Sequence, residues 1–131
     1  EAKSTILEYE KLMYKCDFHL MMSLMDTYIR GMNKYWVKMI RDADKEDDND
    51  LRAQTIIDTF HMVRTAAVLM HPVAPEGTEM ILDYLNLSED FWSWDRIFDS
   101  IYDFMENPSE HNLKFLEPRV DFFAKHESQL M

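Results

Sequence analysis

Apolar residues recur every three or four positions in at least four segments of the chain, and this spacing limits the fold more than any other feature. The segments run from Ile6 to Cys16, Phe18 to Met32, Ala53 to Met70 and Trp94 to Met105. Such spacing places apolar side chains on one face of an α-helix. Only two Gly and four Pro occur in 131 residues, which disfavours a turn-rich sheet protein. We therefore predict an all-α bundle of about five to six helices forming a single domain over residues 1–131.

Punctuating residues give the expected boundaries of the first two helices. Thr5-x-x-Glu8 is a capping-box pattern that opens the first helix, and Asp17 caps the second. Gly31 and Asn33 favour a break in the second helix, because Gly readily adopts the left-handed conformation that ends helices. The predicted core face of the second helix consists of Phe18, Met21, Met22, Met25, Ile29 and Met32.

Prolines mark the later boundaries. A third helix starts near Asp50 and ends near His71, since Pro72 cannot donate a backbone hydrogen bond. Pro75 suits the first turn of a fourth helix, which runs to about Leu85. We expect a fifth helix from Ser93 to Met105 and a last one after Pro118. The predicted core stripe of the third helix consists of Ala53, Ile56, Ile57, Phe60, Val63, Ala67 and Met70.

The charge is strongly acidic and unevenly distributed. There are 14 Lys and Arg against 25 Asp and Glu, a formal net charge of −11. Proteins that bind nucleic acid by themselves gain most of their affinity from neutralising phosphates, so this total argues against autonomous RNA binding. Residues 1–41, however, carry seven basic and five acidic residues, whereas residues 76–110 carry one and ten. An anion-facing surface is therefore expected in the first third.

Several other classes of protein are disfavoured. Cys16 is the only cysteine, so no internal disulfide forms and a reducing, cytoplasmic location is expected. No apolar run has the length of a membrane span, and no signal peptide is apparent, so no membrane partner is expected. Asp58-x-x-His61 is a single carboxylate–imidazole pair, and di-metal bundles need two such pairs and two more Glu, so no metal site is predicted. The start at Glu1 suggests a C-terminal fragment of a larger protein.

Several short segments occur in an order that resembles a known family. The stretch Tyr28-Ile29-Arg30-Gly31-Met32-Asn33-Lys34-Tyr35-Trp36-Val37-Lys38 is followed by His71-Pro72-Val73-Ala74-Pro75, by Leu85-Asn86-Leu87 and by Pro118-Arg119-Val120. This series resembles the helical anticodon-binding domain of class I aminoacyl-tRNA synthetases, most closely the methionyl-tRNA synthetase family. It spans roughly residues 5 to 121. The family has Pro where this chain has Tyr35.

The resemblance implies a tRNA-binding role. In the family the tryptophan stacks on an anticodon base, and Trp36 inherits that role. The implied tRNA-binding residues are Trp36, Tyr35, Arg30, Lys34, Lys38 and Arg41. The implied partners are tRNA and the catalytic domain of the parent protein. That parent would attach an amino acid, with methionine expected, to tRNA at the expense of ATP.

No catalytic residue is expected in this chain. Class I synthetases activate the amino acid with a His-x-Gly-His-type motif and a Lys-Met-Ser-Lys-Ser-type loop, and neither is present. We therefore expect no enzyme activity and no cofactor for the chain alone, ATP belonging to the parent's catalytic domain.

Other interpretations remain open at this stage. Trp36 falls on the core face if the second helix continues, and on the surface if a break at Gly31–Asn33 turns the ring outward beside Lys34 and Lys38. The basic residues also fit a solubilising face. Cys16 is expected in the core, and Phe91-Trp92 is a weaker candidate for a docking patch. The alternative function is a helical protein-interaction module that kept the fold and lost RNA binding.

Overall fold

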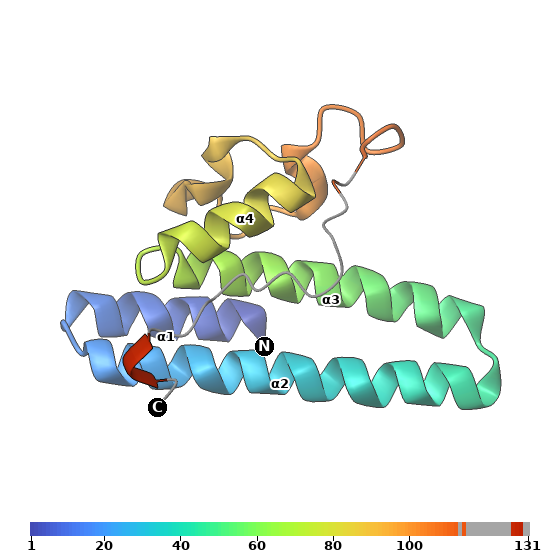
Figure 1. Cartoon of the computed structure of the whole chain (residues 1–131), viewed down its shortest axis with the longest axis horizontal. Helices are drawn as coiled ribbons and strands as arrows, with labels where there is room; N and C mark the ends of the chain where they lie inside the picture. The colour runs from blue at the N-terminus through green and yellow to red at the C-terminus, as the bar shows by residue number, and fades with distance from the viewer. Residues whose placement is uncertain (113, 115–126, 130–131) are drawn as a thin grey trace. The chain divides into compact units, whose positions relative to one another are not determined.

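The computed structural model describes residues 1–112, 114 and 127–129. Four α-helices come first: α1 (Ala2–Tyr14), α2 (Phe18–Glu46), α3 (Asn49–Met70) and α4 (Pro75–Leu85) (Figure 1). Short 3-10 helices follow: η1 (Glu89–Trp92), η2 (Trp94–Arg96), η3 (Ile101–Phe104) and η4 (Glu127–Gln129). The described residues include no β-strand, so the all-α prediction is confirmed. The predicted helix after Pro118 and the Pro118-Arg119-Val120 motif lie outside the described residues.

The chain divides into two compact units, Glu1–Leu69 and Met70–Met131. In the first unit α1 packs against α2, and the short connector between them makes the two helices run antiparallel. Gly31 lies beside the start of α1, because a Cβ placed on it would be 3.8 Å from Oε1 of Glu1. Helix α1 thus accompanies only the first half of α2, and the second half extends beyond it (Figure 1).

Helix α3 returns along α2 after a tight acidic turn. Asp47 ends α2 in the left-handed conformation at φ 51°. The Asp48 carboxylate then accepts a hydrogen bond from the Leu51 backbone N–H at 2.9 Å, which caps α3. Near the turn Arg52 Nη2 pairs with Asp44 Oδ1 at 3.0 Å. At the other end the Tyr9 hydroxyl donates to the Leu69 carbonyl at 2.9 Å, which fastens α1 to α3.

Two predictions about helix ends in the first unit are wrong. Helix α1 begins at Ala2, so Thr5 is a buried residue inside it rather than a cap. The predicted break at Gly31–Asn33 does not occur, and α2 is continuous over 29 residues. Gly31 has no positive φ. The intrinsic weakness of Gly and Asn in a helix is about 1 kcal/mol each or less, which the neighbouring turns and tertiary contacts override.

The predicted core faces of α2 and α3 are only partly right. Met21 and Met25 are buried as expected, but Phe18 and Met22 are about half exposed, at 54 % and 45 %. Phe18 is the first residue of its helix, where less of the bundle covers it. In α3 the predicted Ile56 and Ile57 are exposed. Six consecutive residues of α3, from Arg64 to Leu69, are buried, so that part is covered all round and shows no single stripe.

Cys16 is exposed, contrary to the prediction of a core position. It lies in the connector between α1 and α2 with φ 58°. Its apolar spacing from Met13 therefore belongs to a turn and not to a helix face.

In the second unit the predicted ends of α4 are confirmed. Pro75 occupies the first turn, where a missing N–H costs nothing. Asn86 ends the helix in the left-handed conformation at φ 54°, and the Leu87 N–H bonds back to the Leu82 carbonyl at 3.3 Å. Asn is one of the few residues that adopt this conformation readily, which explains why the helix closes on Leu85-Asn86.

The core of the second unit is built on aromatic rings. Phe91 is fully buried and meets the rings of Trp92 and Phe104 edge-on, at centroid distances of 5.0 and 5.3 Å. Trp92 stacks on His71 at 3.9 Å. The His71 Nδ1 in turn lies 2.9 Å from the Thr78 hydroxyl of α4. The prediction of an exposed Phe91-Trp92 docking patch is therefore wrong.

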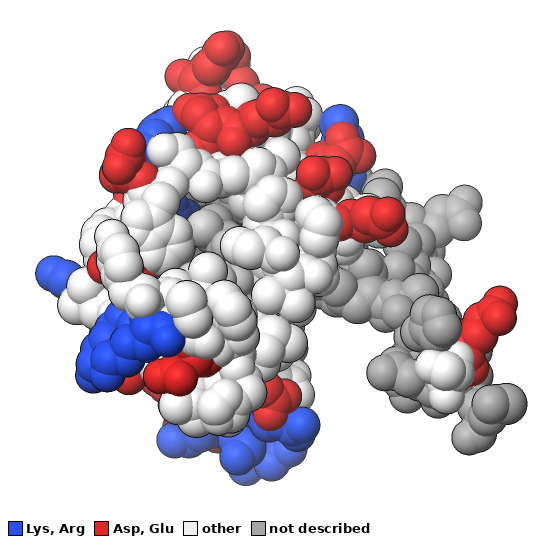
Figure 2. All heavy atoms as spheres, turned by 90° about the vertical axis from the view of Figure 1, so that its left-hand side faces the viewer, with Lys and Arg blue, Asp and Glu red and all other residues white. Residues whose placement is uncertain are grey.

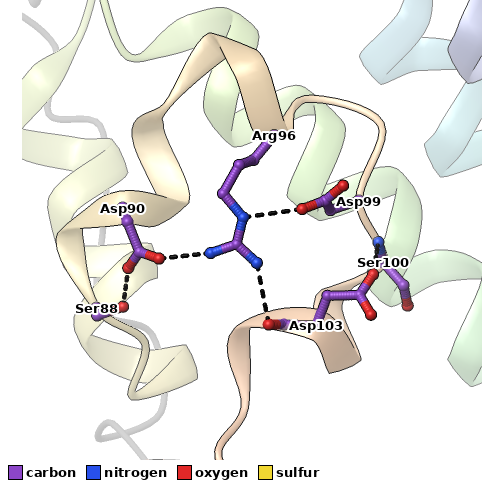
Figure 3. Close-up of polar contacts among 6 residues, drawn as sticks. All are labelled: Ser88, Asp90, Arg96, Asp99, Ser100 and Asp103. Carbon is purple, nitrogen blue, oxygen red and sulfur yellow. Dashed lines mark hydrogen bonds and ion pairs between the residues drawn. The ribbon is translucent and has the colours of Figure 1, made fainter.

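The fifth α-helix predicted from Ser93 is also wrong, because the segment forms the short helices η2 and η3. Arg96 organises it (Figure 3): its guanidinium donates to Asp90, to Asp99 Oδ2 at 2.8 Å and to the Asp103 carbonyl at 3.0 Å. The same group lies 4.0 Å from the centroid of the Phe104 ring. Ser100 caps η3 in a capping box with Asp103. Ser and Asp side chains that hydrogen-bond to nearby backbone groups compete with α-helix formation, and in this segment short 3-10 helices form instead.

Candidate nucleic-acid interface

A row of basic side chains runs from the middle of α2 toward its C-terminal end. Arg30, Lys34, Lys38 and Arg41 follow each other at spacings of four, four and three residues on one continuous helix. At about 100° per residue this spacing keeps them on one flank, and all four are exposed. In Figure 2, Lys and Arg gather at the bottom of the view, the side on which Figure 1 shows α2. A continuous helix thus presents the predicted basic flank directly.

The four cations differ in how far their charge is neutralised. Arg30 Nε pairs with Asp26 Oδ2 at 2.7 Å, and this hydrogen bond raises the pKa of the arginine. Lys34, Lys38 and Arg41 make no ion pair or hydrogen bond with any described residue. These three side chains are therefore the ones available to an anionic ligand.

Two open hollows lie along this part of α2. The first, the basic hollow, is lined by Asn33, Lys34, Val37, Lys38, Arg41, Asp42 and Lys45. The second, the tryptophan hollow, is lined by Trp36, Val37, Ile40, Arg41, Asp44 and Lys45. Val37, Arg41 and Lys45 belong to both, so these residues form a ridge between the two hollows.

Trp36 is partly open to solvent, with 37 % of its surface exposed. The prediction that its indole lies beside Lys34 and Lys38 is wrong. In a continuous helix residues two apart differ by about 200° in direction, so the indole lies nearly opposite both ammonium groups. Its cationic neighbours are Arg41 and Lys45, which line the same hollow.

Tyr35 lines neither hollow and lies on the side of α2 that faces α3. Its hydroxyl donates to Oδ2 of Asp58 at 2.7 Å, and this hydrogen bond raises the pKa of the tyrosine. Gln54 Nε2 donates to the other oxygen of Asp58 at 2.8 Å. The Tyr35 side chain is half-buried, and its polar end is already engaged by another helix.

Sequence reasoning missed six of the residues that line these hollows: Asn33, Val37, Ile40, Asp42, Asp44 and Lys45. Lys45 follows Arg41 by four positions and extends the same flank, so its spacing was a usable signal. The six acidic residues from Asp42 to Asp50 predict a solvated connection around Lys45, and this prediction is wrong, because α2 continues to Glu46. Val37 and Ile40 were outside the predicted core stripe, and their place beside Trp36 follows from the straight helix.

Two other kinds of feature, a metal-binding cluster and a membrane-spanning helix, are absent from the described ranges 1–112, 114 and 127–129. There, no three His, Cys, Asp or Glu side chains are grouped so that they could hold a metal ion. No helix in the same ranges is long and apolar enough to cross a membrane.

Comparison with known proteins adds no relative. The chain matches no protein-family profile, no curated protein and no solved structure.

Proposed function

We propose that this chain is a tRNA-binding helical domain similar to the anticodon-binding domain of a methionyl-type class I aminoacyl-tRNA synthetase. The observation that carries the proposal is the row Lys34, Lys38 and Arg41, whose charges no described acidic group neutralises. Cationic side chains of this kind gain affinity by displacing counterions from phosphates. The order of short motifs in the sequence supplies the family.

The aromatic component of the proposed interface is Trp36. A partly exposed indole can stack on any unpaired base, which contributes about 1–3 kcal/mol per base. Arg41 and Lys45 line the hollow beside it and can meet the backbone of the same nucleotide. Arg30 extends the basic row, and Tyr35, whose hydroxyl is bound to Asp58, completes the proposed set through the placement of its neighbours Lys34 and Trp36. The RNA segment that suits such a surface is an unpaired loop.

The chain supplies no chemistry in this proposal. The ATP-dependent attachment of an amino acid, with methionine expected, is assigned to the catalytic domain of a parent protein, to which this domain would present tRNA. In that scheme the location is cytoplasmic.

Charge reversal on α2 tests the proposal. The triple variant Lys34→Glu, Lys38→Glu, Arg41→Glu should bind a tRNA transcript at least about tenfold more weakly at 50 mM salt, because three phosphate contacts become repulsive. The matched control, Lys3→Glu, Lys11→Glu, Lys15→Glu, changes the net charge by the same amount in and just after α1. Equal losses in both variants would show that general charge, and not the α2 flank, governs binding.

A second candidate is a helical protein-interaction module. It is favoured by the distribution of charge: residues 70–131 carry four basic and thirteen acidic residues, a net charge of −9. Such a segment repels phosphates and suits a basic protein surface. The absence of any measurable tRNA binding by the unmodified chain would favour this module over the tRNA-binding domain.

A further inference from the structure

The middle of α2 is less buried than the residues at either end of it. Tyr28 and Ala43 are buried, but none of the residues from 29 to 42 is. This stretch also contains Gly31 and Asn33, which are weak helix formers. Most helical stability in proteins comes from packing of an apolar face. The stretch therefore gains less stability from packing than the parts of α2 that are buried.

One polar contact joins this stretch to α3. Tyr35 donates to Oδ2 of Asp58 at 2.7 Å, and Gln54 holds Oδ1 of the same carboxylate at 2.8 Å. The other hydrogen bond between side chains in the stretch, from Arg30 to Asp26, stays within α2. Among the described residues, the Tyr35–Asp58 bond is thus the one side-chain hydrogen bond that ties residues 29–42 to another helix.

The place of Tyr35 along the helix gives this bond a directional effect. Lys34 and Trp36 are its immediate neighbours, so they point about 100° to either side of it. With the Tyr35 hydroxyl fixed on α3, Lys34 faces the basic hollow and Trp36 faces the tryptophan hollow. Rotation or bending of α2 at this point would move both hollows together.

We propose that Tyr35 is a positioning residue: its bond to Asp58 keeps α2 straight and so holds the basic and tryptophan hollows in place on either side of the ridge of Val37, Arg41 and Lys45. A ligand that occupies both hollows then crosses the shared ridge of Val37, Arg41 and Lys45. We call the Tyr35–Asp58 hydrogen bond the clamp, and its role in holding α2 straight is inferred from the structural contacts alone. Its effect on RNA affinity rests on the proposed function, and the two are tested separately.

Hydrogen exchange tests the clamp. In Tyr35→Phe the backbone amides of residues 29–42 should exchange about tenfold faster or more, because a hydrogen bond to a charged group is lost and the stretch opens locally. Amides of α1 should be unchanged. Tyr14→Phe is the matched control, because it removes the same hydroxyl group from a tyrosine that is 85 % exposed. Equal exchange over residues 29–42 in both variants would overturn the proposal.

A double mutant tests whether Tyr35 acts through its hydrogen bond to Asp58. Asp58→Ala should raise exchange over the same residues, and the Tyr35→Phe, Asp58→Ala double variant should do no more than the single changes, since both remove one interaction. The indole N–H signal of Trp36, identified by its loss in Trp36→Phe, should shift in each clamp variant and not in Tyr14→Phe. Additive effects on exchange, or an unmoved indole signal, would contradict a positioning role.

Binding of a tRNA transcript then separates the clamp from the function. Tyr35→Phe should weaken binding several-fold and leave the salt dependence unchanged, because the phosphate contacts remain in place. If the unmodified chain binds no RNA while exchange responds as expected, the proposed function fails and the clamp stands. Unchanged affinity in Tyr35→Phe, with the unmodified chain binding tightly, would remove the link between the clamp and RNA.

Discussion

At the scale of single residues, Gly31 is an ordinary helical position next to the proposed interface. It lies within α2 with no positive φ, and a Cβ placed on it would meet Oε1 of Glu1 at 3.8 Å, an ordinary contact. The position therefore tolerates a side chain, and its conformational freedom serves no turn.

Gly31→Ala should stabilise the protein by about 0.5–1 kcal/mol, because Ala restricts the unfolded chain without straining a helical position. Denaturation by urea gives this difference directly. A loss of stability would show that α2 bends at Gly31 in solution, as the sequence alone suggested, and would place Trp36 differently.

Trp36 offers a second test at the scale of one side chain. Because over a third of its surface is exposed, Trp36→Ala should cost about 1 kcal/mol of stability, typical of a surface position. A fully buried aromatic residue would cost about 3–5 kcal/mol. The same variant should weaken tRNA binding through the lost stacking. A large loss of stability with unchanged tRNA binding would assign the indole to the core.

At the scale of the helices, two buried tyrosines make the first unit sensitive to alkali. The pKa values of Tyr9 and Tyr28 are both raised, and desolvation by burial is the largest cause in each case. In the unfolded chain both titrate near the ordinary value of 10.0. Above that pH the unfolded state releases protons that the folded state retains, so stability should fall as pH rises from about 10.

Urea unfolding between pH 8 and pH 11.5 measures this effect. Tyr9→Phe should start about 1 kcal/mol less stable, since its bond to the Leu69 carbonyl is lost, and should then fall less steeply with pH. Tyr14→Phe, which alters an exposed tyrosine, should follow the unmodified protein. Identical slopes for all three proteins would contradict the role given to burial.

The Arg96 cluster provides the corresponding test in the second unit. Arg96→Lys keeps the charge but cannot reach Asp90, Asp99 and the Asp103 carbonyl together, because an ammonium lacks the planar fork of a guanidinium. We expect a lower melting temperature and a changed near-ultraviolet signal from Trp92, which contacts Phe91 in the same core. Arg52→Lys, at the turn between α2 and α3, serves as control. An unchanged melting temperature and near-ultraviolet signal in Arg96→Lys would show that the cluster does not organise this segment.

The elements show which parts of the structure a single sequence can predict. Proline and asparagine fixed the ends of α4, because their backbone preferences are local. The segment after Ser93 has helical apolar spacing, yet Arg96 and the Ser and Asp side chains around it bond to one another and to backbone, which the spacing cannot reveal. The straightness of α2 likewise depends on Asp58, a residue 23 positions away from Tyr35.

The candidate site shows the same division. The basic flank could be predicted, because spacings of three and four are a property of the helix itself. The position of Trp36 relative to Lys34 and Lys38 could not, since it depends on whether α2 breaks. Lys45 was missed because the acidic residues around it made the end of α2 read as a linker.

At the scale of the whole molecule, charge is divided between the two units. Residues 1–69 carry ten basic and twelve acidic residues, a net charge of −2, whereas residues 70–131 have a net charge of −9. The first unit therefore repels phosphates less than the second, and the proposed RNA-binding surface lies on it. Because the total is −11, binding should be modest and strongly reduced by salt.

The salt dependence of tRNA binding tests the central claim most directly. If Lys34, Lys38 and Arg41 each contact one phosphate of an unpaired loop, the logarithm of the binding constant should fall with the logarithm of salt concentration with a slope of roughly −2. Replacing these three residues by Gln should remove this contribution and leave only the shallower slope that Lys45 and Arg30 supply. No detectable binding at 50 mM salt, or an unchanged slope in the triple Gln variant, would contradict the account.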